Sequence, residues 1–454
     1  MVYGDVIRAL GSHLLEVREP RAESGDFGEV VIDTRRMKPG DLFVALKGGR
    51  GDGHDYLGAA LAAGAGAALA ERVPDGLTCA APVFVVSDSL RALQALAAYW
   101  RDRHPARVIG VTGSVGKTSA KDLIADLLAT RYTVLRNEGN LNNEIGLPLT
   151  LLKLSEKHDR AIVEMGMYDL GEIATLCVIA RPSIGVVTNI GPSHLERLGS
   201  LERIAQAKGE LVEALPADGW AVLNGDDERV LALAGRTRAH VIFYGLGTDN
   251  DVRAEDIESL GLGGVRFTLR SEGLAVSVEM AVPGRHNVYG ALAAAAVARI
   301  EGLSLEEIGA GLRGIKGQAH LMVLAGVNGS TIIDDTYNAS PVSAKAALDL
   351  LAELPGRKIA VLGDMLELGS YAEEGHRDVG RRAAQVADML VAVGELGRII
   401  GEEAASGGLV KVIFAGTNEE ASEWLLSALE LGDKVLVKGS RGVRMEQIVD
   451  RIKR

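Results

Sequence analysis

The chain contains only two cysteines and twelve prolines among its 454 residues. Cys79 and Cys177 lie far apart in the sequence, so neither a disulfide framework nor a cysteine-rich metal site is expected, and a reducing cytosol suits the chain. No apolar run is long enough to cross a bilayer. Asp5, Arg8 and His13 interrupt the N-terminal region, which argues against a secretory signal. We therefore expect a cytoplasmic protein without membrane insertion.

Positive charge is also in short supply, because 49 lysine and arginine residues stand against 61 aspartate and glutamate residues, for a net charge of −12. This balance argues against nucleic acid or an anionic membrane as the main partner. Apolar residues make up 47% of the chain, which is enough for large cores, and the 56 glycines indicate many tight turns. The length favours two to four domains.

A glycine turn follows an apolar strand within residues 108–119, and a helical segment begins directly after it. This arrangement is typical of a phosphate-binding loop, in which backbone N–H groups and a helix N-terminus face the anion. Lys117 would neutralise terminal phosphates and Thr118 would ligate Mg²⁺, so the chain is expected to use ATP. The usual spacing puts a glycine at position 111, where this chain has Val111, and a chance glycine turn is the alternative interpretation. The expected nucleotide-binding residues are Gly113, Ser114, Val115, Gly116, Lys117, Thr118 and Ser119.

Periodicity divides the chain into three blocks. Residues 1–104 form a small α/β region that ends in a helix at residues 90–100, and the apolar run at residues 58–70 is expected to be a buried helix against a sheet. Residues 105–316 begin with the phosphate-binding loop and are expected to form a mostly parallel sheet. Residues 317–454 alternate strands and helices, which predicts an open parallel sheet of Rossmann-like shape. The expected fold class is therefore α/β with three domains.

The predicted elements of the second and third blocks follow from continuous apolar runs and helical spacing. Strands are predicted at residues 161–164, 184–188, 221–223, 241–243, 331–334, 358–362, 389–393, 411–414 and 434–437. Helices are predicted at residues 172–179, 201–215, 288–300, 342–354 and 418–429. Alternation at period two over residues 265–269 and 275–282 predicts an antiparallel edge of the second sheet.

Polar side chains stand where predicted strands end. Glu164 ends one strand, Asn189 ends another, and His194 follows in the next loop. Ligands of open α/β sheets bind at the carboxyl ends of strands, so we expect these residues near the phosphate-binding loop, with Glu164 and His194 as candidate Mg²⁺ ligands. Taken alone, Glu164 fits a helix cap or a salt bridge equally well, and His194 fits an ordinary loop histidine. Lys208 alone would be a solvated helical lysine.

Short motifs follow one another in order along essentially the whole chain. They occupy residues 33–35, 39–46, 52–54, 112–118, 139–146, 164–166, 189–196, 207–210, 284–287, 334–341, 363–369 and 438–441. Together they resemble the motifs of the Mur ligases, the ATP-dependent amide-forming enzymes of peptidoglycan precursor synthesis. The resemblance implies three domains that bind UDP, bind ATP and close over the substrates. The implied reaction adds D-alanyl-D-alanine to UDP-N-acetylmuramoyl-tripeptide through an acyl phosphate, and gives the pentapeptide, ADP and phosphate.

The resemblance also implies roles that spacing leaves open. Lys208 would be carbamylated by CO₂, which replaces a cation by an anionic oxygen ligand for Mg²⁺. His286 and Asn287 would read adenine, and Asp335 would meet the nucleotide when the last domain closes. The implied cofactors are ATP and two Mg²⁺ ions. The implied catalytic residues are Lys117, Lys208, His194 and Glu164, and the implied metal ligands are Thr118, Glu164, His194 and Lys208.

The implied partners are small-molecule substrates, and the chain is expected to be a monomer. Substrate-binding candidates are Thr34, Arg35 and Lys47 for UDP, Asn143 for the diphosphate or sugar, and Asn338, Ser340, Lys438 and Arg441 for the peptide and dipeptide. On periodicity alone, residues 33–35 would be a surface turn. Because three substrates lie on three domains, we expect closure about a hinge at residues 314–317. Whether the third residue of the tripeptide is lysine or diaminopimelate is open.

One departure from the family pattern concerns the junction between the second and third blocks. Similar ligases have an arginine near the γ-phosphate there, whereas this chain has Leu321 and no arginine at residues 317–322. Arg313, Lys316 or His320 could substitute. A nucleotide-binding homologue without turnover therefore stays open as an alternative. The preceding Mur ligase is disfavoured because no Asp-Asn-Pro-Arg run occurs, and the N-terminal motif disfavours folylpolyglutamate synthase.

Overall fold

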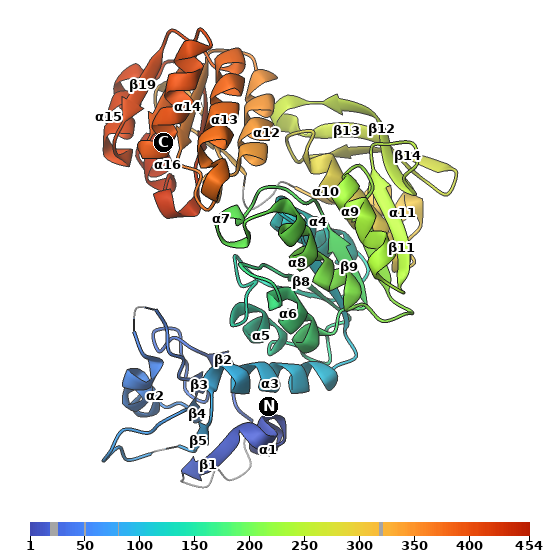
Figure 1. The fold of residues 1–454 in the computed structure, drawn as a ribbon, viewed down its shortest axis with the longest axis vertical. Coiled ribbons are helices and arrows are strands. Elements are labelled where there is room, and N and C mark those ends of the chain that lie inside the picture. The colour runs from blue at the N-terminus through green and yellow to red at the C-terminus, as the bar shows by residue number, and fades with distance from the viewer. Residues whose placement is uncertain (19–25, 50, 80, 317–320) are drawn as a thin grey trace. The chain divides into compact units, whose positions relative to one another are not determined.

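The structure is a computed structural model, and it describes all residues except 19–25, 50, 80 and 317–320 (Figure 1). Within the described residues, the strands form three sheets with helices between them, which confirms the α/β class. Cys79 and Cys177 are both free thiols. The chain divides into two compact units, which are residues 1–110, 131–167 and 171–183, and residues 111–130, 168–170 and 184–454.

The first unit contains a five-stranded sheet. Its order is β1 (Leu14–Arg18), β5 (Val83–Val86), β4 (Ala67–Ala70), β3 (Leu42–Val44) and β2 (Val30–Val31), and β1 alone among these runs antiparallel to its neighbour. Alternate residues of β3 enter different apolar clusters, since Leu42 and Val44 pack in one and Phe43 in the other. Both faces of the sheet are therefore covered, which explains why its inner strands are apolar without interruption.

The apolar run at residues 58–70 corrects one prediction. It forms the end of helix α2 (Leu57–Ala62), a turn, and then strand β4, so the prediction of one buried helix was wrong. A strand that is buried on both faces carries no alternation that would separate it from a buried helix. The helix predicted at residues 90–100 is α3 (Ser89–Asp102), and the Asp88 carboxylate caps its first turn.

The first unit contains further helices and strands outside this five-stranded sheet. They are α1 (Tyr3–Leu10), β7 (Val134–Arg136), α5 (Gly146–Leu151), β8 (Arg160–Glu164) and α6 (Glu172–Ala180). Strands β7 and β8 pair in parallel. Strand β6 (Arg107–Thr112) continues from the first unit into the second.

The second unit holds most of a nine-stranded sheet. Its strands here are β9 (Ile184–Val187), β10 (Trp220–Asn224), β11 (His240–Gly245), β12 (Val252–Ser259), β13 (Val265–Ser271) and β14 (Leu274–Met280). They follow one another in chain order, parallel from β9 to β12 and antiparallel from β12 to β14. The predicted antiparallel edge is confirmed, although β12 was not predicted.

The helices that flank this sheet in the second unit are α4 (Lys117–Leu128), α7 (Leu195–Leu198), α8 (Leu201–Glu213), α9 (Glu228–Leu231), α10 (Asn287–Ile300) and α11 (Leu305–Gly314). Three of them, α4, α8 and α10, lie where predicted, whereas α7, α9 and α11 were not predicted. The alanine-rich helix α10 is almost wholly buried and packs against α4. The helix that begins at the glycine turn is therefore anchored in the core.

The last sheet has six strands in the order β15 (Met322–Ala325), β16 (Thr331–Asp334), β20 (Lys434–Lys438), β17 (Lys358–Gly363), β18 (Met389–Val393) and β19 (Val412–Ala415). All pairs are parallel except β15 with β16, so the predicted open parallel sheet is confirmed with one unpredicted antiparallel strand at its edge. The accompanying helices are α12 (Pro341–Ala352), α13 (Ala372–Val386), α14 (Glu395–Ser406), α15 (Asn418–Ala428) and α16 (Glu446–Ile452).

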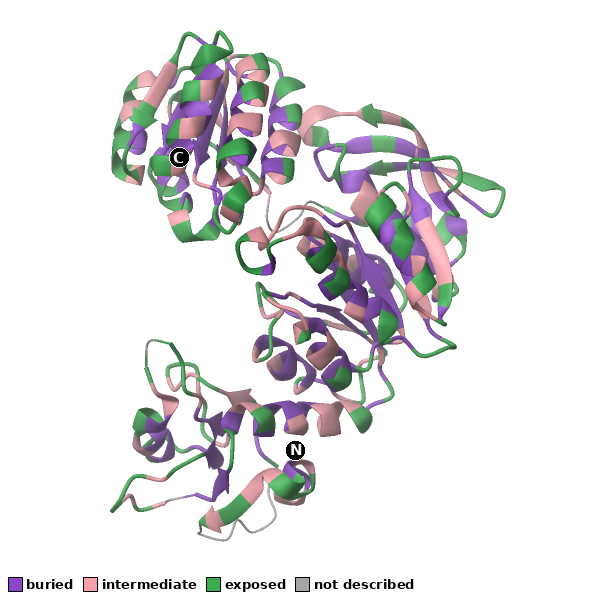
Figure 2. Ribbon diagram, in the orientation of Figure 1, coloured by how far each residue is buried: buried purple, intermediate pink, exposed green. Residues whose placement is uncertain are grey.

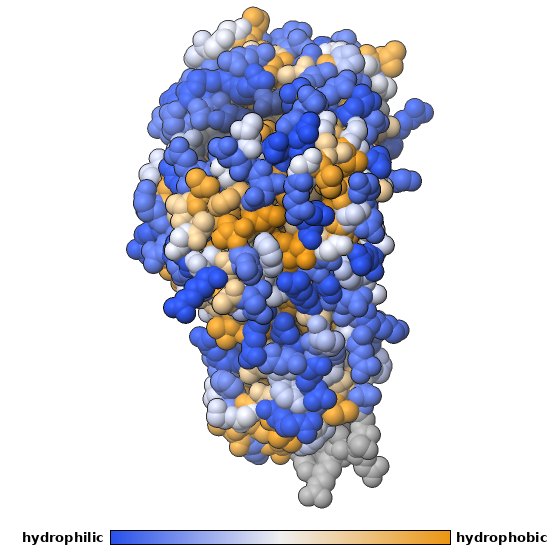
Figure 3. All heavy atoms as spheres, turned by 90° about the vertical axis from the view of Figure 1, so that its right-hand side faces the viewer, coloured by the Kyte–Doolittle hydropathy of each residue, from blue (hydrophilic) through white to orange (hydrophobic). Residues whose placement is uncertain are grey.

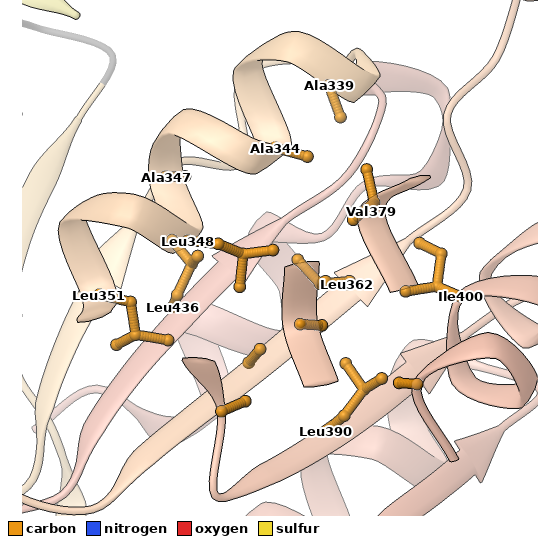
Figure 4. Close-up of a cluster of buried hydrophobic side chains, with 14 of the residues drawn as sticks. Ala339, Ala344, Ala347, Leu348, Leu351, Leu362, Val379, Leu390, Ile400 and Leu436 are labelled. Atoms are coloured by element: carbon orange, nitrogen blue, oxygen red, sulfur yellow. The ribbon is translucent and has the colours of Figure 1, made fainter. Parts of the chain in front are cut away.

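A core lies on each face of this last sheet. On one face, Leu348 and Leu351 of α12 point toward Leu362 of β17 and Leu436 of β20 (Figure 4). The other face packs against α15 and α16. Figure 2 shows these strands as a buried layer between helices whose outer surfaces are exposed. This is the doubly covered arrangement expected of a Rossmann-like sheet.

Among the described helices, none combines the length and the apolar character needed to cross a membrane. On the face drawn in Figure 3, hydrophilic side chains cover most of the surface and hydrophobic side chains gather in smaller patches.

Candidate functional site

The glycine turn connects β6 to α4. Val111 and Thr112 are fully buried in β6, so the strand runs through the position where the usual loop has its first glycine. Gly113 has a φ of +149°, and a Cβ atom built there would overlap the Thr188 hydroxyl oxygen. Only glycine fits this position, and the turn is confined to residues 113–116. The missing glycine at position 111 therefore reflects a longer strand and a shorter loop.

The segment that follows β9 holds the turn in shape. The Val115 N–H donates to Asn189 Oδ1 at 2.9 Å, and Asn189 Nδ2 donates to the Val115 carbonyl at 2.8 Å. The Ser114 N–H donates to the Asn189 carbonyl, and the Ser114 hydroxyl donates to the Gly191 carbonyl. The predicted proximity of Asn189 to the loop is confirmed, and its side chain fixes the loop backbone.

Two lysines converge on one carbonyl oxygen of the loop. Lys117 Nζ donates to the Gly113 carbonyl at 2.9 Å and to the Ser114 carbonyl at 3.2 Å, and Lys208 Nζ donates to the Gly113 carbonyl at 2.9 Å. Lys208 is 1% exposed, so the interpretation from periodicity of a solvated helical lysine was wrong. In the part of the chain that the structure describes, no carboxylate pairs with Lys208.

The surroundings of Lys208 change its protonation. Burial lowers the pKa of the Lys208 amine well below its ordinary value, and the positive charge of Lys117 lowers it further. A neutral amine is the form that attacks CO₂, and a carbamate formed there would be an anion facing a cationic loop. Thr118 and Ser119 lie in the first turn of α4 beside this loop. The Lys117 cation fits nucleotide phosphates, and a Lys208 carbamate together with the Thr118 hydroxyl would fit a magnesium ion.

Glu164 ends β8 in the first unit and is 2% exposed. Asn142 Nδ2 donates to Glu164 Oε1 at 2.7 Å, and the Glu164 N–H donates to Asn137 Oδ1 at 2.9 Å. Asn142 was not predicted to have a role, although it lies within the motif at residues 139–146. Its amide holds the Glu164 carboxylate in a fixed orientation.

His194 begins α7 in the second unit with a φ of 55° and a side chain that is 22% exposed. Its Nδ1 atom lies 2.7 Å from Glu367 Oε2, and the Tyr168 ring packs edge-on against the imidazole with centroids 5.1 Å apart. The interaction with His194 lowers the pKa of the Glu367 carboxyl, although burial acts to raise it. Glu367 was missed because nothing in the sequence links it to His194.

Histidine, cysteine, aspartate and glutamate side chains alone do not form a metal site. Across the described ranges, no group of three or more of them is arranged to hold a metal ion. The metal ligands expected from the resemblance are Glu164 and His194 together with the Thr118 hydroxyl and the carbamylated Lys208. Glu164 lies in the first unit and the other three ligands lie in the second.

The UDP candidates lie on the surface of the first unit. Arg35 Nη2 is 2.7 Å from Asp33 Oδ2, and the Arg35 side chain is 87% exposed. This hydrogen-bonded pair lowers the pKa of the Asp33 carboxyl to about 2. Thr34 is half-buried and Lys47 is exposed. The stretch is a surface turn, as periodicity alone indicated, and it presents an accessible guanidinium group.

Asn143 has a structural contact of its own. Its Oδ1 atom accepts from the Gly146 N–H at 2.9 Å and so supports the start of α5. Asn287 is likewise engaged, because its Nδ2 atom donates to the Pro283 carbonyl at 2.7 Å at the start of α10, next to the exposed His286.

In the last sheet, Lys438 is 3% exposed and pairs with Asp335 at 2.6 Å. Its Nζ atom also donates to the Asn338 carbonyl at 2.8 Å. The structure thus brings three of the predicted residues together at the ends of β16 and β20. Asp335 is engaged with a cation from its own sheet.

Two further candidates lie close by. The guanidinium carbon of Arg441 lies 5.2 Å from the centre of the Tyr337 ring, a cation–π contact. The Ser340 hydroxyl accepts from the Ser343 N–H and caps α12.

The junction is described only in part. Residues 317–320, which include His320 and one end of the expected hinge, lie outside the described residues. Leu321 packs against the core of the last sheet. Arg313 donates to the Ser277 carbonyl at 2.8 Å, and Lys316 is exposed.

Fold and site together define an α/β protein with a phosphate-binding loop and a buried, uncompensated lysine beside it, the class of nucleotide-using enzymes. Three family descriptions match the chain: "Mur ligase family, catalytic domain" at residues 27–101, "Mur ligase middle domain" at 111–298 and "Mur ligase, glutamate ligase domain" at 321–441. The chain belongs to the Mur ligase family.

Several similar proteins share the same name. The UDP-N-acetylmuramoyl-tripeptide–D-alanyl-D-alanine ligase of Escherichia coli is 40% identical over 92% of each chain, and that of Bacillus subtilis is 39% identical over 95% of this chain and 94% of its own. A crystal structure of MurF from Acinetobacter baumannii matches with a TM-score of 0.88 and 31% identity over 98% of this chain and 97% of its own. MurF ligase from Thermotoga maritima in complex with ADP matches with a TM-score of 0.82 and 31% identity over 93% of this chain and 96% of its own.

Proposed function

We propose that this chain is an ATP-dependent ligase that joins D-alanyl-D-alanine to UDP-N-acetylmuramoyl-tripeptide, in the cytoplasm and as a monomer. The observation that carries the proposal is Lys208, a buried amine without a carboxylate partner in the described residues, which donates to the same loop carbonyl as Lys117. The names of the similar proteins supply the substrates.

In this proposal, each of the three domains binds a different substrate. Residues 1–104 bind the UDP moiety, residues 105–316 bind ATP, and residues 317–454 bind the incoming dipeptide and close over the nucleotide. The three family descriptions fall inside these boundaries, at residues 27–101, 111–298 and 321–441.

Carbamylation of Lys208 prepares the site. The neutral amine attacks CO₂, forms an N–C bond and releases a proton, which leaves an anionic carbamate. Thr118, Glu164, His194 and the modified Lys208 would hold two Mg²⁺ ions. When bound, these ions act as Lewis acids that neutralise the charge between the γ-phosphate and the substrate carboxylate.

In the first chemical step, the terminal carboxylate of the tripeptide attacks the γ-phosphorus of ATP. A new O–P bond forms as the bond to the ADP oxygen breaks, and Lys117 stabilises the negative charge that accumulates on the transferred group. Backbone N–H groups at the start of α4, within the loop residues 113–119, hold the remaining phosphates, and His286 and Asn287 contact the adenine. Asp335 approaches the nucleotide when the last domain closes.

In the second step, the neutral amine of D-alanyl-D-alanine attacks the acyl carbon. A tetrahedral intermediate forms, the amine nitrogen gives up a proton, and the intermediate collapses as phosphate leaves with the electron pair of the C–O bond. Lys438, Arg441, Asn338 and Ser340 orient the peptide and dipeptide, while Thr34, Arg35, Lys47 and Asn143 hold the nucleotide sugar. Exclusion of water from the closed site protects the acyl phosphate.

Phosphate release from ATP tests the proposal directly. Release should require both UDP-N-acetylmuramoyl-tripeptide and D-alanyl-D-alanine, and mass spectrometry should find the pentapeptide. Tripeptides that end in lysine or in diaminopimelate, assayed separately, decide which third residue is used. ATP binding without release in either mixture would contradict the proposal and favour a homologue without turnover.

A further inference from the structure

A loop of the last sheet touches the helix that begins at His194. The loop connects β17 to α13, and its residues Gly369–Tyr371 form a short 3-10 turn that packs against α7. A Cβ atom built on Gly369 would lie 2.6 Å from the Glu196 Cα atom. Such backbone-to-backbone proximity admits only glycine, so the contact is close along the main chain and does not depend on long side chains.

At this contact, Glu367 faces His194. Its Oε2 atom lies 2.7 Å from His194 Nδ1 in an ion-pair contact, and that nitrogen atom is buried and forms no hydrogen bond of standard geometry with the described residues. Both residues have positive φ, 65° for Glu367 and 55° for His194, a conformation that non-glycine residues rarely adopt. Unusual backbone conformations on both sides of one contact point to a functional constraint.

The loop that carries Glu367 is fixed on its own side. The Met365 N–H donates to Nε2 of the fully buried His376 at 2.9 Å, and the Leu366 N–H donates to the Ser440 hydroxyl at 2.9 Å. His376 Nδ1 lies 2.6 Å from the Ala372 carbonyl oxygen, which sets its tautomer. These hydrogen bonds hold in place the two residues that precede Glu367.

The imidazole of His194 is held from two directions. Tyr168 packs edge-on against the ring, and Glu367 lies at Nδ1. A carboxylate beside one ring nitrogen keeps the proton on that nitrogen and leaves the lone pair of the other nitrogen for a metal ion. With the Glu367 carboxylate beside Nδ1, the nitrogen left for a ligand is Nε2.

We propose that Glu367 is a positioning residue that sets the tautomer and orientation of His194 for Mg²⁺, through the contact of the β17–α13 loop with α7. This inference rests on the proposed function, because it takes His194 as a metal ligand. It explains why a glutamate far away in sequence meets this histidine through a glycine contact.

The test compares Glu367→Ala and Glu367→Gln with the wild-type chain, and uses Glu402→Ala as a matched control. Glu402 is an exposed glutamate in the same part of the chain that pairs with Arg398 on its own helix. Mn²⁺ binding by electron paramagnetic resonance, in the presence of a non-hydrolysable ATP analogue, serves as a readout without turnover. The ¹⁵N resonances of His194, assigned by their loss in His194→Gln, report the tautomer.

We expect Glu367→Ala to weaken Mn²⁺ binding about 10–100-fold, with a similar rise in the Mg²⁺ concentration needed for phosphate release. The His194 resonances should move from the Nδ1–H form toward a mixture of tautomers. Glu367→Gln should keep part of the Nδ1–H form and part of the affinity, because its amide oxygen stays beside Nδ1 although the negative charge is lost. Glu402→Ala should behave like the wild type.

Unchanged Mn²⁺ affinity and unchanged His194 resonances in Glu367→Ala would overturn the inference. Equal thermal melting of the variants excludes misfolding as the cause of any loss. If the wild-type chain forms no pentapeptide, the proposed function fails. If it is active and Glu367→Ala matches it in every readout, this inference alone fails.

Discussion

Two buried lysines of this chain, Lys208 and Lys438, are nearly equally hidden from solvent, at 1% and 3% exposure, yet their surroundings differ. Lys438 pairs with Asp335 and donates to the Asn338 carbonyl. Lys208 donates to a loop carbonyl beside a second lysine, and no carboxylate of the described residues pairs with it.

The difference separates two uses of a buried cation. A compensated lysine holds neighbouring segments together, here the ends of β16 and β20. An uncompensated lysine gives up its proton, and the pKa of Lys208 is accordingly lowered by burial and by Lys117. In a loop that fits an anion, such an amine is suited to accept CO₂ and to become an anion itself.

The largest expected effects on activity concern Lys208 and Lys117, which both donate to the Gly113 carbonyl. Both Lys208→Ala and Lys117→Ala should lose about 10²–10³-fold in the rate of phosphate release, because each removes a group that stabilises charge in the transition state. Short-chain carboxylic acids should restore part of the activity of Lys208→Ala, since they return an oxygen ligand, and none of that of Lys117→Ala. Full activity of unrescued Lys208→Ala would remove the carbamate from the mechanism.

A smaller effect concerns stability in CO₂-free buffer without ligands. Lys438→Met should lower the free energy of unfolding by about 2–3 kcal/mol, because it leaves Asp335 without its cation. Lys208→Met should raise it by about 1–2 kcal/mol, since it replaces an uncompensated buried amine by an apolar side chain of similar length. Urea denaturation measures both changes in the free energy of unfolding. Changes of the same sign in the two variants would contradict the proposed difference between the two lysines.

The advantage of Lys208→Met should also depend on pH. The amine is neutral in the folded chain above its lowered pKa, whereas in the unfolded chain it stays protonated up to its ordinary pKa of 10.5. Between these values the unfolded state binds more protons, so the stability of the wild type rises with pH. The margin of Lys208→Met over the wild type should therefore shrink as the pH rises toward 10.5, by at most about 1.4 kcal/mol per pH unit. Urea denaturation across this range measures the margin, and a constant margin would show that Lys208 stays protonated when folded.

Much of this arrangement was predictable from sequence, because strand and helix patterns in the second and third blocks are strong. The parallel strands β16 to β20 and the turn at residues 113–116 lie where predicted. The apolar run at residues 58–70 was misread because a doubly buried strand has no period. The short edge strand β15 was missed.

The partners of the candidate residues were not predictable. Asn142 reaches Glu164 and Glu367 reaches His194 through contacts that the fold creates, and no local pattern marks either pair. Periodicity alone left Lys208 on the surface, whereas the resemblance placed it at the metal site, and the structure buries it beside the loop. Side-chain protonation follows from such surroundings and not from residue type.

Carbamylation of Lys208 can be observed directly by ¹³C NMR of the ligand-free chain in ¹³C-bicarbonate. We expect a lysine carbamate resonance in the wild type and in Lys438→Met, and none in Lys208→Ala. No carbamate resonance in the wild type, or one that persists in Lys208→Ala, would contradict the claim that Lys208 is the neutral amine that takes up CO₂.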